Sequence, residues 1–130
     1  MKGIYVLIVQ VSKPVALTIG ALGEVTFKAG FYAYVGSAQN NLELRLARHQ
    51  RRDKRLFWHI DYLLDNPKVS VVDVFYKSGG KSEECKMAGM LEKNGGKPIK
   101  GFGCSDCHCK SHLFNGEVFQ FLQTQMQLLK

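Results

Sequence analysis

The chain has 130 residues, of which 45% are hydrophobic, and its 18 lysines and arginines outnumber its 11 aspartates and glutamates to give a formal net charge of +7. This length predicts one domain over residues 1–130 with a single core, and it is too short for two full domains. The apolar stretch of residues 4–11 is too short to span a membrane and lacks a small-residue cleavage site. We therefore expect a basic domain that has no membrane partner and suits a polyanion.

The four cysteines are distributed unevenly along the chain. Three of them, Cys104, Cys107 and Cys109, lie close together, and Cys85 is the fourth. Secreted proteins that depend on disulfides spread their cysteines more evenly. A reducing, cytoplasmic location is therefore expected.

The first part of the chain predicts strands and one hairpin. Residues 3–11 form a short apolar run that ends at Ser12-Lys13-Pro14, which is typical of a buried strand. A hairpin of residues 13–29 follows, and a further strand over residues 31–35 is expected to end at Gly36-Ser37. The hairpin strands are expected at residues 15–19 and 24–28, around a turn at 20–23.

The rest of the chain predicts helices around one more strand. A helix should begin near Asn40 or Asn41, either of which can cap it, and Leu42 and Leu46 form the apolar stripe that would seat it on the sheet. Ser82 is the expected cap of a later helix. The remaining elements are expected as a helix over 56–64, a strand over 69–76, a helix over 82–93, a loop over 95–111 and a helix over 116–129. Together they predict an α/β (α+β) fold in which helices flank a small central, mostly antiparallel sheet.

Two strand tyrosines, Tyr5 and Tyr34, precede a helix that carries Arg45-x-x-x-His49. Hydrolysis of a phosphodiester requires a base that deprotonates water, positive charge near the transition state and help for the leaving oxygen. A tyrosine needs nearby cations to serve as the base, and Arg45 is such a cation. Arg45 can also bind two phosphate oxygens, and His49, one turn later, can hydrogen-bond a tyrosine or the phosphate. Taken one at a time, strand tyrosines and helix histidines more often serve packing.

The tripeptides Gly3-Ile4-Tyr5 and Tyr34-Val35-Gly36, followed by Arg45 and His49, resemble the motifs of the GIY-YIG endonuclease superfamily, with valine in place of isoleucine in the second tripeptide. Later blocks resemble one group within it, the domains of unknown function 123. These blocks are residues 57–64, Glu84-Cys85, residues 101–107 and residues 111–114. Tyr34 follows Tyr5 by 29 positions, which exceeds the spacing in compact members of the superfamily. The inserted hairpin would absorb the difference if it leaves the strands at 3–11 and 31–35 paired as neighbours.

The resemblance implies a GIY-YIG nuclease-like fold and a role for each residue of the site. Tyr5 is the expected general base, and Tyr34 is a second hydroxyl that orients phosphate or water. Arg45 is expected to bind phosphate. Glu84 is the expected ligand of Mg²⁺ or Mn²⁺, with its neighbour Glu83 as the alternative.

Basic residues follow Arg45 in the next part of the chain. We expect them to bind nucleic acid, although a solvated helix face would give the same pattern. They are Arg48, Arg51, Arg52, Lys54 and Arg55. The following helix carries His59 and Asp61 two residues apart, so that they point to different faces. His59 is expected to support catalysis, and Asp61 is expected to be structural.

The sequence Cys104-x-x-Cys107-x-Cys109-x-x-His112 has the ligand types of a zinc site. Structural zinc sites usually join two ligand pairs across a longer loop, whereas these candidates lie within nine residues. Small buried cysteines in a tight loop are therefore the favoured interpretation, and Zn²⁺ is the alternative cofactor. Cys85 would contribute only if the fold brings it close.

The resemblance, together with the basic charge, implies a metal-dependent endonuclease that hydrolyses DNA, and RNA remains an alternative substrate. Some members of the smaller group are fused to a glycosylase that resembles endonuclease III, which implies an association with DNA-repair enzymes. Two rival functions fit the same residues. One is a non-catalytic nucleic-acid-binding module, and the other is an interaction domain stabilised by zinc. The discriminating feature is whether Tyr5, Arg45 and Glu84 converge on one site.

Overall fold

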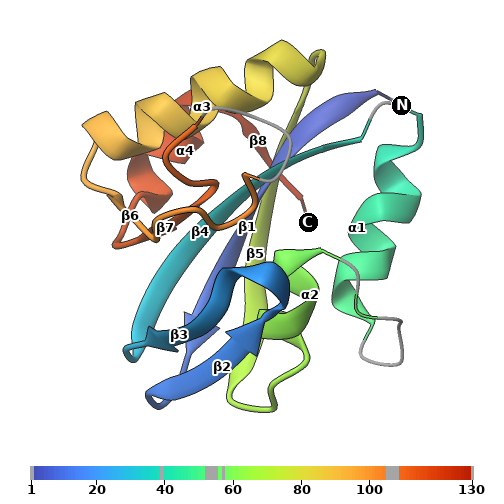
Figure 1. Cartoon of the computed structure of the whole chain (residues 1–130). Coiled ribbons are helices and arrows are strands. Elements are labelled where there is room, and N and C mark those ends of the chain that lie inside the picture. The colour runs from blue at the N-terminus through green and yellow to red at the C-terminus, as the bar shows by residue number, and fades with distance from the viewer. Residues whose placement is uncertain (1, 39, 52–55, 57, 105–108, 130) are drawn as a thin grey trace.

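The computed structural model describes residues 2–38, 40–51, 56, 58–104 and 109–129. Within these residues, six strands form one sheet in which each neighbouring pair is antiparallel. In spatial order they are β6 (Lys97–Pro98), β7 (Leu113–Asn115), β4 (Gly30–Ala38), β1 (Gly3–Val11), β5 (Val69–Ser78) and β8 (Gln127–Leu128). Helices pack on both faces of the sheet (Figure 1). The predicted α/β (α+β) fold with a mostly antiparallel sheet is therefore confirmed.

The central strand β1 pairs along its whole length with β4 on one side and β5 on the other. All of its residues except Gln10 are buried. Because both faces are covered, its apolar residues run nearly continuously instead of alternating with polar ones. The prediction that the neighbouring strand ends at Gly36-Ser37 was wrong, since β4 continues through these small residues to Ala38, which pairs with Gly3.

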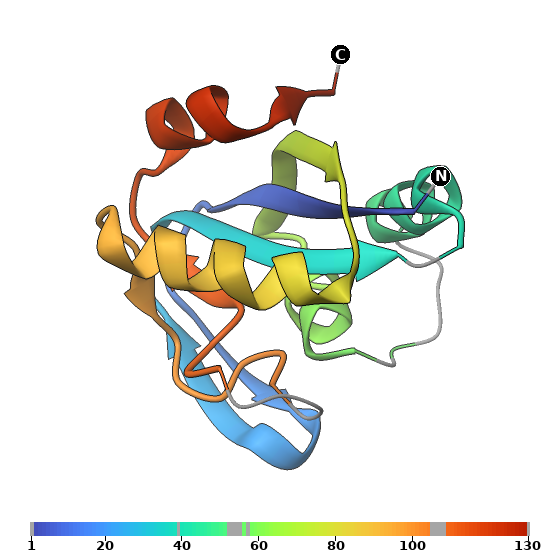
Figure 2. The same cartoon turned by 90° about the horizontal axis from the view of Figure 1, so that it is seen from above.

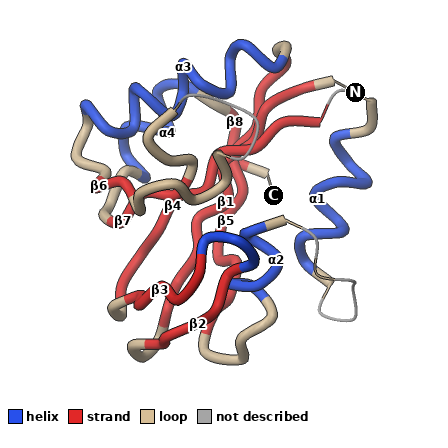
Figure 3. Tube along the Cα trace, viewed as in Figure 1, coloured by secondary structure: helices blue, strands red, loops and turns tan. Residues whose placement is uncertain are grey.

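The inserted hairpin is a separate two-stranded sheet, formed by β2 (Val15–Ile19) and β3 (Gly23–Phe27). A 3-10 turn, Gly20–Leu22, joins the strands, and Gly20 and Gly23 have φ angles of 46° and 82°, which favour glycine. Figure 3 shows the hairpin extending away from the helices α3 (Lys81–Lys93) and α4 (Phe119–Gln125). The insertion leaves β1 and β4 as direct neighbours in the sheet, which is the condition for the hairpin to absorb the long spacing between the two tyrosines.

One face of the sheet is covered by α1 (Leu42–Gln50) and α2 (His59–Leu64). Asn41 caps α1, because its side-chain oxygen accepts a hydrogen bond from the backbone nitrogen of Leu44 at 3.0 Å. The predicted stripe of Leu42 and Leu46 is buried against the sheet. The beginning of α1 is therefore set by the residues that the sequence indicated.

The helix α2 is shorter than predicted and begins at His59 instead of Leu56. Its start is fixed by Asp61, whose carboxylate accepts a hydrogen bond from the backbone nitrogen of Trp58 at 2.8 Å. The same carboxylate accepts two hydrogen bonds from the guanidinium of Arg48, each 2.9 Å long. This bidentate pair joins α1 to α2 and compensates the charge of a fully buried carboxylate.

The opposite face is covered by α3 and α4, and α3 runs alongside β4 (Figure 2). Their apolar side chains pack on Ile4, Val6 and Ile8, whereas Tyr5 and Leu7 point to the other face. Ser82 does not cap α3 as predicted, since the helix begins at Lys81 with Gly80 at its N-cap, and no side chain of the described residues caps it.

The C-terminal elements depart further from the prediction. The helix expected over residues 116–129 is confined to α4, because Met126 adopts an extended backbone that leads into β8 at the edge of β5. The loop expected over 95–111 contains the short strand β6, which pairs with β7. No helix in the described part of the chain is long and apolar enough to cross a membrane.

Candidate active site

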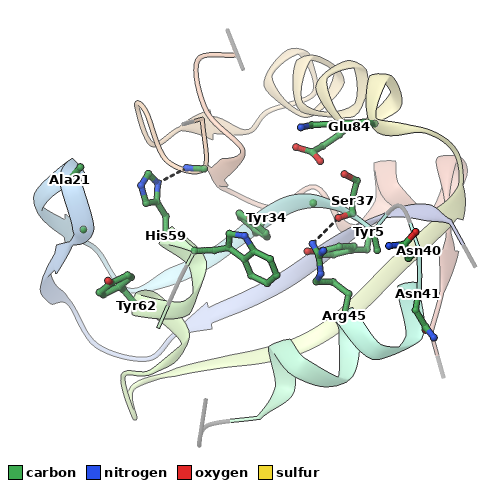
Figure 4. A pocket seen from close by; sticks show the side chains of 16 residues that line it. Tyr5, Ala21, Tyr34, Ser37, Asn40, Asn41, Arg45, His59, Tyr62 and Glu84 are labelled. Atoms are coloured by element: carbon green, nitrogen blue, oxygen red, sulfur yellow. Dashed lines mark hydrogen bonds between the residues drawn. The ribbon is translucent and has the colours of Figure 1, made fainter. Parts of the chain in front are cut away.

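A cavity of about 710 Å³ lies where β4 extends beyond its partner β7. Pairing with β7 stops at Tyr34, so the end of β4 is exposed to the cavity. We call it the Tyr5 cavity, and Figure 4 shows its side chains. It is lined by Tyr5, Gly20, Ala21, Tyr34, Gly36, Ser37, Ala38, Asn40, Asn41, Arg45, Trp58, His59, Tyr62, Lys81, Glu84 and Gly103.

Five of the residues predicted for the site line this one cavity: Tyr5, Tyr34, Arg45, His59 and Glu84. The two tyrosines are diagonal neighbours on the same face, because Tyr5 pairs with Gly36 and Tyr34 pairs with Leu7. The long insertion between them therefore does not separate them. In Figure 4, Glu84 reaches toward Arg45 and Tyr5 from the opposite side of the cavity.

Gly36 leaves the space that the ring of Tyr5 occupies. A Cβ atom built on Gly36 would lie 2.4 Å from both the Cζ and the hydroxyl oxygen of Tyr5. Such an approach is far inside van der Waals contact, and Tyr5 is itself buried. The glycine of the second tripeptide thus determines where the tyrosine of the first tripeptide can lie.

The hydroxyl oxygen of Tyr5 lies 2.7 Å from Nε2 of His49, within hydrogen-bond distance. Burial raises the pKa of Tyr5 above its ordinary value, while the charge of Arg45 and its hydrogen bond to the tyrosine act in the opposite direction. Burial likewise raises the pKa of Tyr34, with the neighbouring Tyr5 adding to the effect. Both tyrosines are therefore neutral at neutral pH. His49 does not line the cavity, but it contacts the candidate base directly.

Arg45 is held in place by two further contacts. Its Nη1 donates a hydrogen bond to the carbonyl oxygen of Ser37 at 2.9 Å, and its guanidinium carbon lies 4.3 Å from the ring centroid of Trp58. This contact of Trp58 was not predicted from the sequence; Trp58 comes from the segment before α2 and also lines the cavity. The cation of Arg45 is therefore positioned before any phosphate binds.

The predicted nucleic-acid-binding cluster is only partly described. Arg48 uses its guanidinium to hold Asp61 and packs on Trp58 at 4.2 Å, so it supports α1 and α2. This arrangement agrees with the structural role expected for Asp61. Arg51 is exposed, immediately after α1. The remaining members, Arg52, Lys54 and Arg55, lie outside the described residues.

Glu84 lies in the first turn of α3, and its Oε2 is 2.7 Å from Nδ1 of His112. The side chains of Glu84 and His112 are 12% and 1% exposed, so this contact is shielded from bulk water. The alternative carboxylate, Glu83, does not line the cavity and lies 3.6 Å from Lys86. The geometry therefore favours Glu84 over Glu83 as a ligand for a cation in the cavity.

His59 supports the wall of the cavity. Its Nδ1 accepts a hydrogen bond from the backbone nitrogen of Gly103 at 2.8 Å, and burial lowers the pKa of its imidazole. Gly103 has a φ of 75°, and a Cβ atom there would lie 3.4 Å from the ring of Tyr34. His59 thus holds the segment that packs against Tyr34, which is a positioning contact.

Lys81 is a second cavity residue that the sequence analysis missed. It follows Gly79-Gly80 as the first residue of α3. Its position one turn before Glu84 was the only sequence signal that it could line the same site. Asn40, Asn41 and Tyr62 also line the cavity. The cavity thus holds a lysine and a carboxylate from α3 and an arginine from α1.

Of the alternative zinc ligands in the cysteine-rich loop, the structure groups Cys109 and His112 with Cys85. Potential ligand atoms of Cys85, Cys109 and His112 lie within 4.8 Å of one another. Cys104 is not part of this group, and its Sγ lies 3.5 Å from the carbonyl oxygen of Phe102. Cys107 lies outside the described residues. The fold therefore brings in Cys85, which is distant in sequence from the cysteine-rich loop.

Comparison with protein families finds one match that covers almost the whole chain. A family described as Domain of unknown function DUF123 matches residues 4–129. Neither the curated proteins nor the solved structures yield a match.

Replacing Gly36 by alanine tests the packing of Tyr5. We expect Gly36→Ala to lower the free energy of unfolding by about 1–3 kcal/mol, because the new methyl group overlaps the tyrosine ring. Gly89→Ala is the matched control, since a Cβ atom there meets nothing within 4 Å and alanine suits a helix. Chemical denaturation measures both changes, and equal effects of the two substitutions would contradict the packing argument.

The ionisation of Tyr5 can be measured by the ultraviolet absorbance of phenolate. We expect the transition that Tyr5→Phe removes to lie well above pH 10, the ordinary tyrosine range, because burial raises this pKa. The folded state then holds a proton that the unfolded state loses near pH 10. Stability from Tyr5 is therefore complete below about pH 10 and is lost as the pH rises toward the folded-state pKa. If the transition that Tyr5→Phe removes lies at or below pH 10, Tyr5 is not buried in this way.

Proposed function

The chain belongs to the Domain of unknown function DUF123 family, whose description names no activity, and we propose that it is a metal-dependent endonuclease of the GIY-YIG type that hydrolyses DNA phosphodiester bonds. The observation that carries the proposal is the convergence of Tyr5, Arg45 and Glu84 on one cavity from three separate elements. A base, a fixed cation and a carboxylate are the groups that phosphodiester hydrolysis requires.

Arg45 and Lys81 are the phosphate-binding groups in this proposal. Both line the Tyr5 cavity, and Arg45 is already oriented by Ser37 and Trp58. A guanidinium that is fixed before the substrate binds loses little entropy when negative charge develops on the phosphorus oxygens. The formal net charge of +7 would draw a polyanion toward this site.

Tyr5 and His49 together form the base. Tyr5 is neutral, so it cannot accumulate as phenolate, but its hydroxyl lies 2.7 Å from an imidazole nitrogen. As water attacks phosphorus, the water proton moves to the oxygen of Tyr5 while the tyrosine's own proton moves to Nε2 of His49. His49 becomes imidazolium, and Tyr5 is neutral before and after the transfer. This relay explains how a tyrosine with a raised pKa can accept a proton at neutral pH.

Glu84 would hold the metal ion. A carboxylate oxygen that lines the Tyr5 cavity is the hard ligand that Mg²⁺ or Mn²⁺ prefers, and Mg²⁺ commonly uses few protein ligands in addition to water and substrate oxygens. The bound ion would supply positive charge to the transition state and to the leaving oxygen. His112 orients the carboxylate through its contact at 2.7 Å.

Tyr34 contributes a second hydroxyl to the cavity wall, and His59 keeps the adjoining segment in place. The choice of DNA, the link to DNA-repair enzymes and a cytoplasmic setting rest on the family resemblance and on charge. Cleavage of RNA is therefore an outcome to be measured with the same assay.

The second candidate is a nucleic-acid-binding module that lacks turnover. It is favoured by the burial of Tyr5 and Tyr34, since buried neutral tyrosines also serve packing. The two candidates share the basic charge and differ in whether the tyrosine relay and Glu84 change a rate. Catalysis must therefore be separated from binding in the same preparation.

The test is cleavage of supercoiled, single-stranded and branched DNA in Mg²⁺ or Mn²⁺. We expect Tyr5→Phe to slow cleavage by about 100- to 10,000-fold, because it removes the general base. Glu84→Ala should abolish metal-dependent cutting. Matched controls are Tyr76→Phe and Glu83→Ala, which alter a tyrosine and a glutamate that do not line the cavity.

The binding module predicts another set of results. It predicts salt-sensitive DNA binding without cleavage, with Tyr5→Phe and Glu84→Ala binding as well as the wild type. That outcome, obtained with folded protein, would refute the endonuclease proposal. Cleavage that persists in both variants would place the activity outside the Tyr5 cavity.

A further inference from the structure

Within the group of Cys85, Cys109 and His112, only His112 takes part in the proposed hydrolysis, through its contact with Glu84, and the two thiols are unused there. Cys85 follows Glu84 on α3. Cys109 and His112 lie in the segment before β7, and His112 is the residue directly before that strand. Potential ligand atoms of all three lie within 4.8 Å of one another. The fold thus brings three side chains with metal-binding atoms close together from two distant parts of the chain.

We propose that Cys85, Cys109 and His112 bind a zinc ion. Two thiolates and one imidazole are the ligand types that zinc takes in proteins, whereas Mg²⁺ and Mn²⁺ prefer oxygen. The Cys109-x-x-His112 pair supplies two ligands from one short segment, and α3 supplies the third. This zinc site is distinct in chemistry from a magnesium or manganese site at Glu84.

After small adjustments, the spacing of the three ligand atoms suits three corners of a tetrahedral zinc site, and water would take the fourth corner. With Zn–S bonds of about 2.3 Å and Zn–N bonds of about 2.0–2.1 Å, ligand atoms lie about 3.5–3.8 Å apart. The three atoms here lie within 4.8 Å, so each side chain would move by about 1 Å or less toward the ion. Cys85 is exposed on α3 and can make this adjustment without disturbing the core.

The contact between His112 and Glu84 supports the zinc site independently. Nδ1 of His112 lies 2.7 Å from the Glu84 carboxylate, so the zinc proposal assigns Nε2 to the metal. Histidines that bind zinc commonly donate their other ring N–H to a carboxylate, which fixes the tautomer and makes the ligand more basic. His112 is 1% exposed, so its orientation is already fixed by packing.

Zinc at this position would also affect the Tyr5 cavity. The ion would tie α3 to the segment before β7, and His112 would then hold Glu84 in a fixed orientation. His112 is anchored on its other side, because its backbone nitrogen donates a hydrogen bond to Phe102 at 2.8 Å. We therefore expect zinc to act as a structural clamp behind the carboxylate.

The test is the metal content of the full chain after chelation, reloading with Zn²⁺ and dialysis. We expect about one zinc ion per chain, a rise in melting temperature on zinc addition, and a thiolate-to-cobalt charge-transfer band when Co²⁺ replaces zinc. These readouts do not require DNA cleavage, so the zinc proposal and the endonuclease proposal can fail separately.

Single substitutions test which residues hold the ion. Cys85→Ser should lower zinc affinity by more than about 100-fold, and Cys109→Ser should do the same, because each removes a direct ligand. Glu84→Gln should weaken binding by about 10- to 100-fold through His112. The matched control is Cys104→Ser, which alters a neighbouring cysteine outside the group and should bind zinc like the wild type.

Three results would overturn the zinc proposal. The first is a folded wild-type chain that retains no zinc after reloading. The second is zinc binding that Cys85→Ser leaves unchanged or that Cys104→Ser reduces equally. The third is a Cys85–Cys109 disulfide in protein kept under reducing conditions, detected by peptide mass analysis. Because Cys85 is exposed, its serine variant is expected to fold even if Cys109→Ser does not.

Discussion

The pairing of Tyr5 with Gly36 is the constraint on which the rest of the site depends. It places a buried tyrosine opposite the one residue type that leaves room for its ring. From this position the hydroxyl reaches His49 on α1, and Tyr34 becomes a diagonal neighbour on the same face. A shift of one residue in the register would turn Tyr5 toward α3 and remove it from the cavity. The candidate chemistry therefore follows from the pairing of two strands.

The helices then bring charge to this tyrosine from two directions. On one side Arg45 is held by Ser37 and Trp58, and the pair of Arg48 with Asp61 keeps α1 and α2 together behind it. On the other side α3 carries a carboxylate into the cavity from across the end of β4. The opposing charges are fixed mainly by buried contacts, so a substrate phosphate would meet an arrangement that needs little reorganisation.

Local sequence patterns predicted the elements that depend on local interactions. The strand β1 was predictable because a strand that is buried on both faces is a nearly continuous run of apolar residues. The cap at Asn41 was predictable because it needs only a hydrogen bond within one helical turn. The family resemblance supplied the site tyrosines, Arg45 and Glu84. The role of Trp58 and the contact between Glu84 and His112 were not predictable, since both depend on residues that only tertiary packing brings together. The early end of α4 likewise follows from strand pairing at β8, which helical periodicity cannot indicate.

The most direct measurement is a double-mutant cycle on single-turnover DNA cleavage, with Tyr5→Phe, Glu84→Gln and the combined variant. If both residues serve one reaction in the Tyr5 cavity, the combined variant should cleave about as slowly as the slower single variant, because groups that act as a unit give strongly non-additive losses. Two results would contradict this account. One is wild-type protein that leaves every DNA substrate intact, and the other is a combined loss equal to the product of the two single losses.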